Sequence, residues 1–178
     1  MDNRKIEKAS ALWLSLILVL LSLMSQVIDW YTVGVYAGCP WGHHLTYPFF
    51  HAGILHAALN CWCLLSVVFL YDVKWRRLLA MLAIAMLVPV DVWASTFPSL
   101  LKPTVGLSGM IYALFGSLSF DVKRKLYYQQ SMLIYIAIGF FLPNSSAVIH
   151  ALCYTAGLAL AGFNKLIVHY DRRNKQHS

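Results

Sequence analysis

Six long apolar segments dominate this sequence and limit the folds open to the chain. The chain has 178 residues, of which 60% are hydrophobic and only 12% are charged. A soluble domain of this size usually carries about a quarter charged residues. Because the apolar residues gather into long blocks, the sequence predicts an all-α, polytopic membrane protein rather than a soluble globular domain.

Each apolar block is the length of one transmembrane helix or slightly shorter. No internal repeat or low-complexity tract divides the chain, so we predict one membrane domain over residues 1–178. The first block is interpreted as a retained helix, because it has no small-residue cleavage site. The six predicted helices span about 11–28, 53–71, 78–94, 106–120, 131–142 and 147–168.

Lysine and arginine residues predict the orientation of these helices. If the N-terminus is cytoplasmic and the chain crosses six times, Lys102 is the one basic residue outside, and the other 13 of the 14 face the cytoplasm. Such an asymmetry supports six spans with both termini in the cytoplasm. It also accounts for the net charge of +7, so nucleic acid is not an expected partner. The cytoplasmic set is Arg4, Lys5, Lys8, Lys74, Arg76, Arg77, Lys123, Arg124, Lys125, Lys165, Arg172, Arg173 and Lys175.

Two outer regions are unusual for a simple helical bundle. The connection over residues 29–52 is rich in tryptophan, tyrosine and phenylalanine, which is typical of a segment in the membrane interface. The fourth helix would be only roughly 22 Å long, against about 30 Å of hydrocarbon. We therefore expect it to begin below the outer surface, at the floor of a water-filled cavity.

Polar side chains within predicted spans are costly and call for an explanation. His56 and Asn60 lie early in the second span, Ser108 opens the fourth and His150 lies early in the sixth. These three spans run in the same direction, so the four side chains share one depth near the outer leaflet.

Together the four residues form a coherent set for acyl transfer. Ser108 is the predicted nucleophile and His150 the base that takes its proton. His56 and Asn60 are candidate donors to an oxyanion. No acidic residue lies at this depth in the three helices, so a Ser-His dyad is expected, with neither a metal nor a cofactor. Taken singly, each of these side chains would more often be a helix cap or an interhelical hydrogen bond.

Two motifs resemble those of the rhomboid family of intramembrane serine proteases. His51–Asn60 (HAGILHAALN) is similar to the second-helix motif, and Gly106–Gly116 (GLSGMIYALFG) to the fourth-helix motif. The resemblance extends over about residues 30–162 and implies a six-helix bundle that cleaves transmembrane protein substrates within the lipid bilayer.

The resemblance also implies roles for individual residues. Ser108 would be the nucleophile, and its backbone amide would join His56 and Asn60 in the oxyanion hole. Tyr112 would stack on the catalytic histidine, and His51 would pin the first loop. Gly106 and Gly109, beside Ser108, would let other backbone come close. Two stripes of small residues would let the fourth and sixth helices approach closely, one of Gly109, Ala113 and Gly116 and the other of Gly157 and Ala161.

Two features depart from the family pattern. Many members carry Trp-Arg in the first loop, where this chain has Trp41-Gly42-His43. The family's histidine usually stands three residues before a glycine, whereas His150 is seven before Gly157 and Tyr154 takes the expected place.

Because of these departures, the alternative function is a catalytically inactive rhomboid-like protein that binds transmembrane clients. A small transporter is a third possible function. We expect the chain to be a multi-pass protein of the bacterial inner (plasma) membrane. Asp91 has no explanation at this level.

Overall fold

The computed structural model describes residues 3–142 and 145–174, and regular structure in these ranges is helical apart from an isolated antiparallel bridge between Val35 and Thr104. The elements, in chain order, are α1 (Asn3–Ser22), η1 (Leu23–Gln26), α2 (Trp30–Val33), α3 (Trp41–Thr46), η2 (Tyr47–Phe49), α4 (Ile54–Leu70), α5 (Trp75–Met86), α6 (Val90–Trp93), η3 (Pro98–Leu101), α7 (Ser108–Leu118), α8 (Lys125–Gly139) and α9 (Ala147–Asn174).

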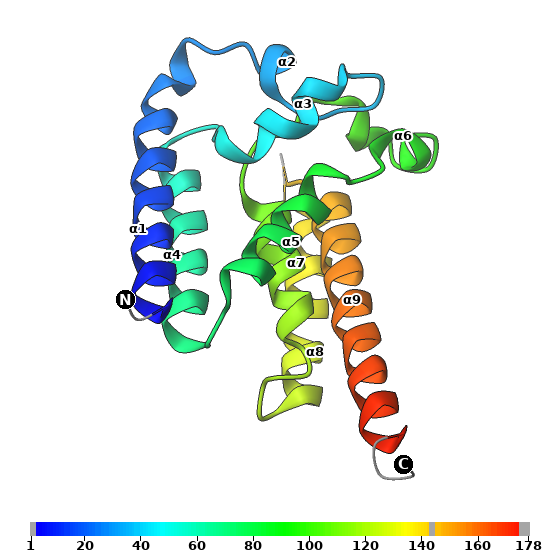
Figure 1. Ribbon diagram of the computed structural model, residues 1–178. Coiled ribbons are helices and arrows are strands. Elements are labelled where there is room, and N and C mark those ends of the chain that lie inside the picture. Colours follow the sequence, from blue (N-terminus) through cyan, green and yellow to red (C-terminus); the bar gives the residue numbers. More distant parts are fainter. Residues whose placement is uncertain (1–2, 143–144, 175–178) are drawn as a thin grey trace.

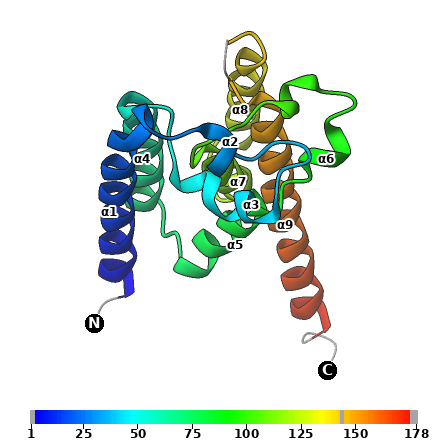
Figure 2. The ribbon, with the colours of Figure 1, turned by 90° about the horizontal axis from the view of Figure 1, so that it is seen from above.

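Helix α7 lies at the centre of the bundle. It packs against α9 along its length and against α5, while α1 and α4 form a pair on one side of the molecule (Figures 1 and 2). The sequence explains this placement, because α7 (SGMIYALFGSL) is apolar all round and carries no charge. A helix that is apolar all round is either buried within protein or exposed to lipid, and in this bundle most of α7 is buried.

The outer helices present large apolar side chains away from the bundle. Trp13 on α1 is 67% exposed, Trp62 on α4 is 74% exposed and Leu166 on α9 is 69% exposed. In water such surfaces would drive aggregation, whereas in a bilayer they contact lipid tails. This exposure supports the assignment of the chain as an integral membrane protein.

Each of the six predicted spans corresponds to a helix, but the helices differ in length. Two are long and apolar enough to cross a membrane, within Lys5–Ser25 and Ala147–Val168. A third is obtained if Trp41–Phe49 and Ile54–Leu70, which meet at a bend of 83°, are counted as one broken span. Since α5, α7 and α8 are shorter, six crossings and the orientation of the termini stay predictions.

Several helix boundaries differ from those of the predicted spans. Helix α1 begins at Asn3 rather than near residue 11, and α9 continues to Asn174 rather than ending near 168. The predicted third span reached residue 94, but α5 ends at Met86. Pro89 lacks an amide proton and restricts the residue before it, so the chain turns and restarts as the short α6. The predicted fifth span began near residue 131, but α8 starts at Lys125, because its first turns are helical without being apolar.

A buried carboxylate joins α1 to the start of α5. Glu7 is 4% exposed, and its Oε1 accepts a hydrogen bond of 3.3 Å from the backbone amide of Trp75. The first amides of a helix have no partner within the helix and favour a negative charge. Glu7 therefore caps α5 from a different part of the chain.

Candidate active site

The first loop, residues 29–52, lies over one end of the bundle and is fastened to the end of α5. His44 Nδ1 donates to the carbonyl oxygen of Met86 at 2.9 Å, and Tyr47 Oη donates to that of Ala85 at 2.8 Å. These carbonyls belong to the last turn of α5, where the helix offers no amide one turn further on, although Ala85 O also accepts from the backbone amide of Val88 at 3.2 Å. His44 is also stacked on Trp41, with ring centroids 5.0 Å apart.

Asp91 has a structural explanation in the same loop. Its Oδ1 accepts a 2.6 Å hydrogen bond from the backbone amide of Gly38. Gly38 has a φ of 83°, in the left-handed region that favours glycine. Asp91 therefore ties the turn of the first loop to α6, and its side chain lies at the exposed end of the bundle rather than within it.

The first loop also holds the backbone immediately before Ser108. Gly106 N–H donates to the carbonyl oxygen of Tyr47 at 2.9 Å, and Leu107 N–H donates to His51 Nε2 at 3.3 Å. His51 is 1% exposed, and burial together with the neighbouring His56 lowers its pKa to about 4. It is therefore neutral at neutral pH, as its acceptor role requires.

Gly106 forms a point of close approach between this backbone and α4. Its φ is 131°, and a Cβ atom there would lie 2.8 Å from His56 Cε1 and 3.5 Å from Asn60 Nδ2. Only glycine fits such a position. The side chains of His56 and Asn60 therefore border the chain two residues upstream of Ser108.

Asn60 is polar, buried and short of partners. It is 7% exposed, and within residues 3–142 and 145–174 its Nδ2 has no hydrogen-bond partner. A buried donor without an acceptor costs about 1–3 kcal/mol, so such groups are rare in a stable interior.

Ser108 and His150 are brought into direct contact from two helices. Ser108 is the first residue of α7, and His150 lies in the first turn of α9. Ser108 Oγ is 2.8 Å from His150 Nε2, which is hydrogen-bond distance. Both side chains are half-buried, so they are enclosed yet accessible. The ring of Tyr112 stacks on that of His150.

Tyr154 lies elsewhere. Its hydroxyl is hydrogen-bonded to Gln129 Oε1 on α8 and lies 3.3 Å from Ser119 Oγ, just beyond the end of α7. Ser119 is eleven residues after Ser108, which is about 16 Å along a helical chain. Tyr154 therefore links α7, α8 and α9 at the end of the bundle away from Ser108.

Two glycines set the separation of α7 and α9. A Cβ on Gly116 would lie 2.1 Å from the carbonyl oxygen of Tyr154, and a Cβ on Gly157 would lie 2.0 Å from that of Ala113. The two backbones are thus in direct contact, and the close approach predicted from the small-residue stripes is confirmed. Gly109 gives room to the first loop as well as to α9, since a Cβ there would lie 3.0 Å from Tyr47 Oη and 3.4 Å from Cys153 Sγ.

Comparison with known protein families gives a match that covers most of the chain. A family model described as the rhomboid domain matches residues 38–161, which is more than half of the chain. The chain belongs to the rhomboid family. No curated protein and no solved structure matches it. The protein is therefore a rhomboid-family intramembrane protease or an inactive homologue of one, and it is an integral membrane protein.

The matched range of the rhomboid domain contains every predicted site residue. Ser108, His150 and Tyr112 are in mutual contact or stacked, and His56 and Asn60 flank Gly106. His51 lies beside them, with its ring centroid 5.1 Å from that of His56. The arrangement thus gathers residues from α4, α7, α9 and the first loop.

Sequence reasoning missed two side chains that position this rhomboid site. Tyr47 and His44 hold the first loop to α5, and Tyr47 also supplies the carbonyl that fixes Gly106. Both stand in an aromatic-rich stretch that was interpreted only as an interfacial segment. The available signal was the burial of two polar rings in a loop, which becomes visible only once the fold is known.

Proposed function

We propose that this rhomboid protein is an intramembrane serine endopeptidase that uses Ser108 as nucleophile and His150 as general base. The observation that carries the proposal is the 2.8 Å separation of Ser108 Oγ and His150 Nε2. A serine hydroxyl becomes an effective nucleophile when a base within hydrogen-bond reach takes its proton. The stacked ring of Tyr112 keeps the imidazole in the orientation that this transfer needs.

The reaction follows from these positions. Ser108 O–H donates to Nε2 of the neutral His150, and Oγ attacks the carbonyl carbon of the scissile peptide bond while the proton passes to Nε2. The imidazolium then gives that proton to the leaving amine, which leaves an acyl group on Ser108. A water molecule, deprotonated by His150, hydrolyses this ester and restores the hydroxyl. The proposed reaction uses neither a metal nor a cofactor.

We assign the developing oxyanion to donors from α4 and α7. Asn60 Nδ2 has no partner within the described residues, and the His56 ring lies beside Gly106. The Ser108 backbone amide is at the first position of α7, where amides have no acceptor within the helix. Donors fixed before the reaction stabilise charge without reorganisation, which is their advantage over water.

We further propose that residues 1–178 form a single six-span domain with both termini in the cytoplasm, in a bacterial inner membrane, acting on transmembrane protein substrates. Two observations support this topology. The basic residues are concentrated in the segments assigned to the cytoplasm, and the start of α1 and the end of α9 point away from α2, α3 and α6 (Figure 1).

If this orientation holds, Cys39 in the first loop should react with a membrane-impermeant thiol reagent in intact cells. Labelling of Cys39 only after solubilisation and unfolding would refute this orientation.

The decisive experiment is labelling with a serine-directed fluorophosphonate probe, together with cleavage of a transmembrane reporter. We expect the wild type to react in both assays and Ser108→Ala to react in neither, with unchanged folding. Cleavage that survives in Ser108→Ala would remove the nucleophile from this position.

The alternative, an inactive rhomboid-like protein that binds transmembrane clients, rests on the seven-residue spacing between His150 and Gly157. The short contact between Ser108 and His150 argues for the enzyme despite that spacing. A parent protein inert toward every probe and reporter, yet able to bind transmembrane segments, would favour the alternative.

A further inference from the structure

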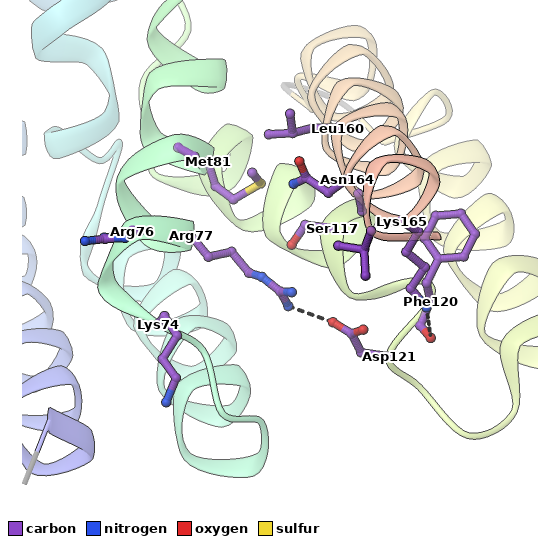
Figure 3. Close-up of a pocket in the computed structure, with 13 residues that line it drawn as sticks. Lys74, Arg76, Arg77, Met81, Ser117, Phe120, Asp121, Leu160, Asn164 and Lys165 are labelled. Atoms are coloured by element: carbon purple, nitrogen blue, oxygen red, sulfur yellow. Dashed lines mark hydrogen bonds and ion pairs between the residues drawn. The ribbon is translucent and has the colours of Figure 1, made fainter. Parts of the chain in front are cut away.

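A cavity of about 770 Å³ lies at the end of the bundle away from Ser108, between the start of α5, the end of α7 and α9 (Figure 3). Ser117 lines it, and this residue is nine positions after Ser108, or about 13 Å along α7. The cavity is therefore separate from the proposed catalytic pair. Its volume is in the range of ligand-binding pockets, about 300–1,000 Å³.

One side of this cavity is strongly cationic. Four of the lining residues are basic, namely Lys74, Arg76, Arg77 and Lys165, against the single carboxylate of Asp121. Arg77 pairs with Asp121 at 2.8 Å, and both side chains are more than a third exposed. Lys165 Nζ donates to the carbonyl oxygen of Phe120 at 3.0 Å, a contact that neutralises no charge. Lys74 likewise pairs with Asp72 at 2.9 Å. The excess of positive charge at the mouth of the cavity therefore comes from Arg76 and Lys165.

The other walls are apolar. Met81 on α5 and Leu160 and Val168 on α9 line the same space, and Figure 3 shows Met81 and Leu160 on either side of it. Leu160 is 36% exposed and Val168 is 49% exposed, so this wall continues into the outer surface of α9. A soluble anion would use the cationic mouth but would gain nothing from the apolar wall.

The cationic side chains all belong to the group assigned to the cytoplasmic face. The cytoplasmic leaflet carries anionic lipids, and basic pockets between transmembrane helices on that side are suited to their head groups. A phospholipid presents a phosphate diester at the depth of the charged residues and an acyl chain at the depth of the apolar ones. Its chemistry thus matches both walls.

We propose that this cavity binds an anionic phospholipid of the cytoplasmic leaflet. The phosphate lies against Arg77 and Lys165, and an acyl chain follows Met81, Leu160 and Val168. Asp121 orients the Arg77 guanidinium, whose remaining N–H groups can donate to the phosphate. The proposal depends on the cytoplasmic placement of the basic residues and not on the catalytic assignment, so the two can fail separately.

The test is a lipid titration of the purified full chain by native mass spectrometry, with phosphatidylglycerol, phosphatidylcholine or inorganic phosphate. The charge variant is Arg77→Gln with Lys165→Gln. Its matched control is Arg124→Gln with Lys123→Gln, which removes the same charges from exposed positions outside the cavity. A third variant, Ala161→Phe, narrows the cavity and keeps all of its charges.

We expect tight binding of phosphatidylglycerol to the wild type, weakened roughly tenfold or more in the charge variant and about twofold or less in the control. Ala161→Phe should also weaken binding, and it keeps the test valid if the charge variant does not fold. Equal losses in the charge variant and the control would reduce the effect to general surface charge and overturn the proposal. Three other results would also overturn the proposal: equal affinity for phosphatidylcholine, unchanged binding in Ala161→Phe, and displacement of the lipid by inorganic phosphate.

Discussion

The imidazole ring of His150 is stacked on the phenol ring of Tyr112, with centroids 4.2 Å apart and planes inclined by 12°. Tyr112 is four residues after Ser108, so it stands one turn below the hydroxyl on the same face of α7. One helix thus supplies both the proposed nucleophile and the surface that orients its base. The rotation of the His150 ring is limited by α7 rather than by α9, on which it is carried.

This stack predicts different effects for two substitutions at Tyr112. Tyr112→Phe keeps the ring and should cleave a transmembrane reporter at nearly the wild-type rate. Tyr112→Ala removes a stacking contact of about 0.5–1.5 kcal/mol and should lower kcat about threefold to tenfold. Reporter cleavage under saturating substrate measures both. If Tyr112→Phe were as slow as Tyr112→Ala, the hydroxyl rather than the ring would be the important group.

Substitution of His150 should be far more severe than substitution of Tyr154. A general base contributes about 10²–10⁴ in rate, so His150→Ala should lose at least that much cleavage and most of its reactivity with fluorophosphonate. Tyr154→Phe removes a hydroxyl bonded to Gln129 and should lower the unfolding temperature more than the rate. Near-normal cleavage by His150→Ala would rule out the dyad.

His56 and Asn60 should assist the reaction without activating Ser108. Loss of one oxyanion donor typically costs about 10²–10³ in rate, so we expect that loss in His56→Ala and in Asn60→Ala. Both variants should still be labelled by the probe, because Ser108 and His150 remain in contact. A variant that turned over substrate like the parent would have only a packing role at that position.

Two glycines of α9 should respond in opposite ways to alanine. Gly157→Ala places a Cβ 2.0 Å from the carbonyl oxygen of Ala113, which forces α7 and α9 apart. We expect a destabilisation of about 1–3 kcal/mol or more, together with loss of cleavage.

Gly162→Ala is the matched control in the same helix. Its Cβ would meet the Phe120 ring at an ordinary 3.7 Å. This variant should be neutral, or stabilised by about 0.5–1 kcal/mol through helix propensity. Thermal unfolding in detergent and reporter cleavage report both effects. Equal behaviour of the two variants would contradict the backbone contact at Gly157.

The lowered pKa of His51 leads us to expect that the folded protein loses stability on acidification. Burial and the nearby His56 lower its pKa from 6.5 to about 4 in the folded state. As the pH falls below 6.5, the unfolded chain takes up the proton first, so folding stability contributed by neutral His51 declines between these two values. Above pH 6.5 it is fully present.

Thermal unfolding of the parent and of His51→Gln, at neutral pH and near pH 5, measures this contribution. Glutamine does not titrate, so the variant should have a lower unfolding temperature at neutral pH but a smaller decrease on acidification. An identical decrease in the two proteins would mean that other groups cause the acid sensitivity.

Much of this arrangement follows from local sequence. Hydropathy located all six principal helices, because each has an apolar block of its own. The close approach of α7 and α9 was readable from the spacing of Gly109, Gly116 and Gly157, since small residues repeated on one face favour helix contact. The positions of Ser108, His56 and Asn60 near the starts of their helices were enough to predict that these side chains lie at one depth.

Other features depend on contacts between distant segments and leave no local pattern. Glu7 caps a helix 68 residues later, and Asp91 binds an amide 53 residues earlier. The ends of α5 and α8 were misplaced for a related reason, because hydropathy measures polarity while helix limits depend on proline and on hydrogen bonds. His150, not Tyr154, was predicted as the base. The height of either side chain along α9 relative to Ser108 depends on how the helices pack, and local sequence does not give that height.

The contact between α7 and α9 has a consequence for sequence variation and for redesign. At both tight points the glycine meets a main-chain carbonyl oxygen, that of Tyr154 or of Ala113, and such an atom is present whatever side chain those positions carry. The requirement is therefore one-sided: positions 116 and 157 must lack a Cβ, while no particular side chain is demanded across the contact. An engineer who wished to transfer this pair of helices to another scaffold would have to keep two glycines and the helix register, and could vary most of the rest.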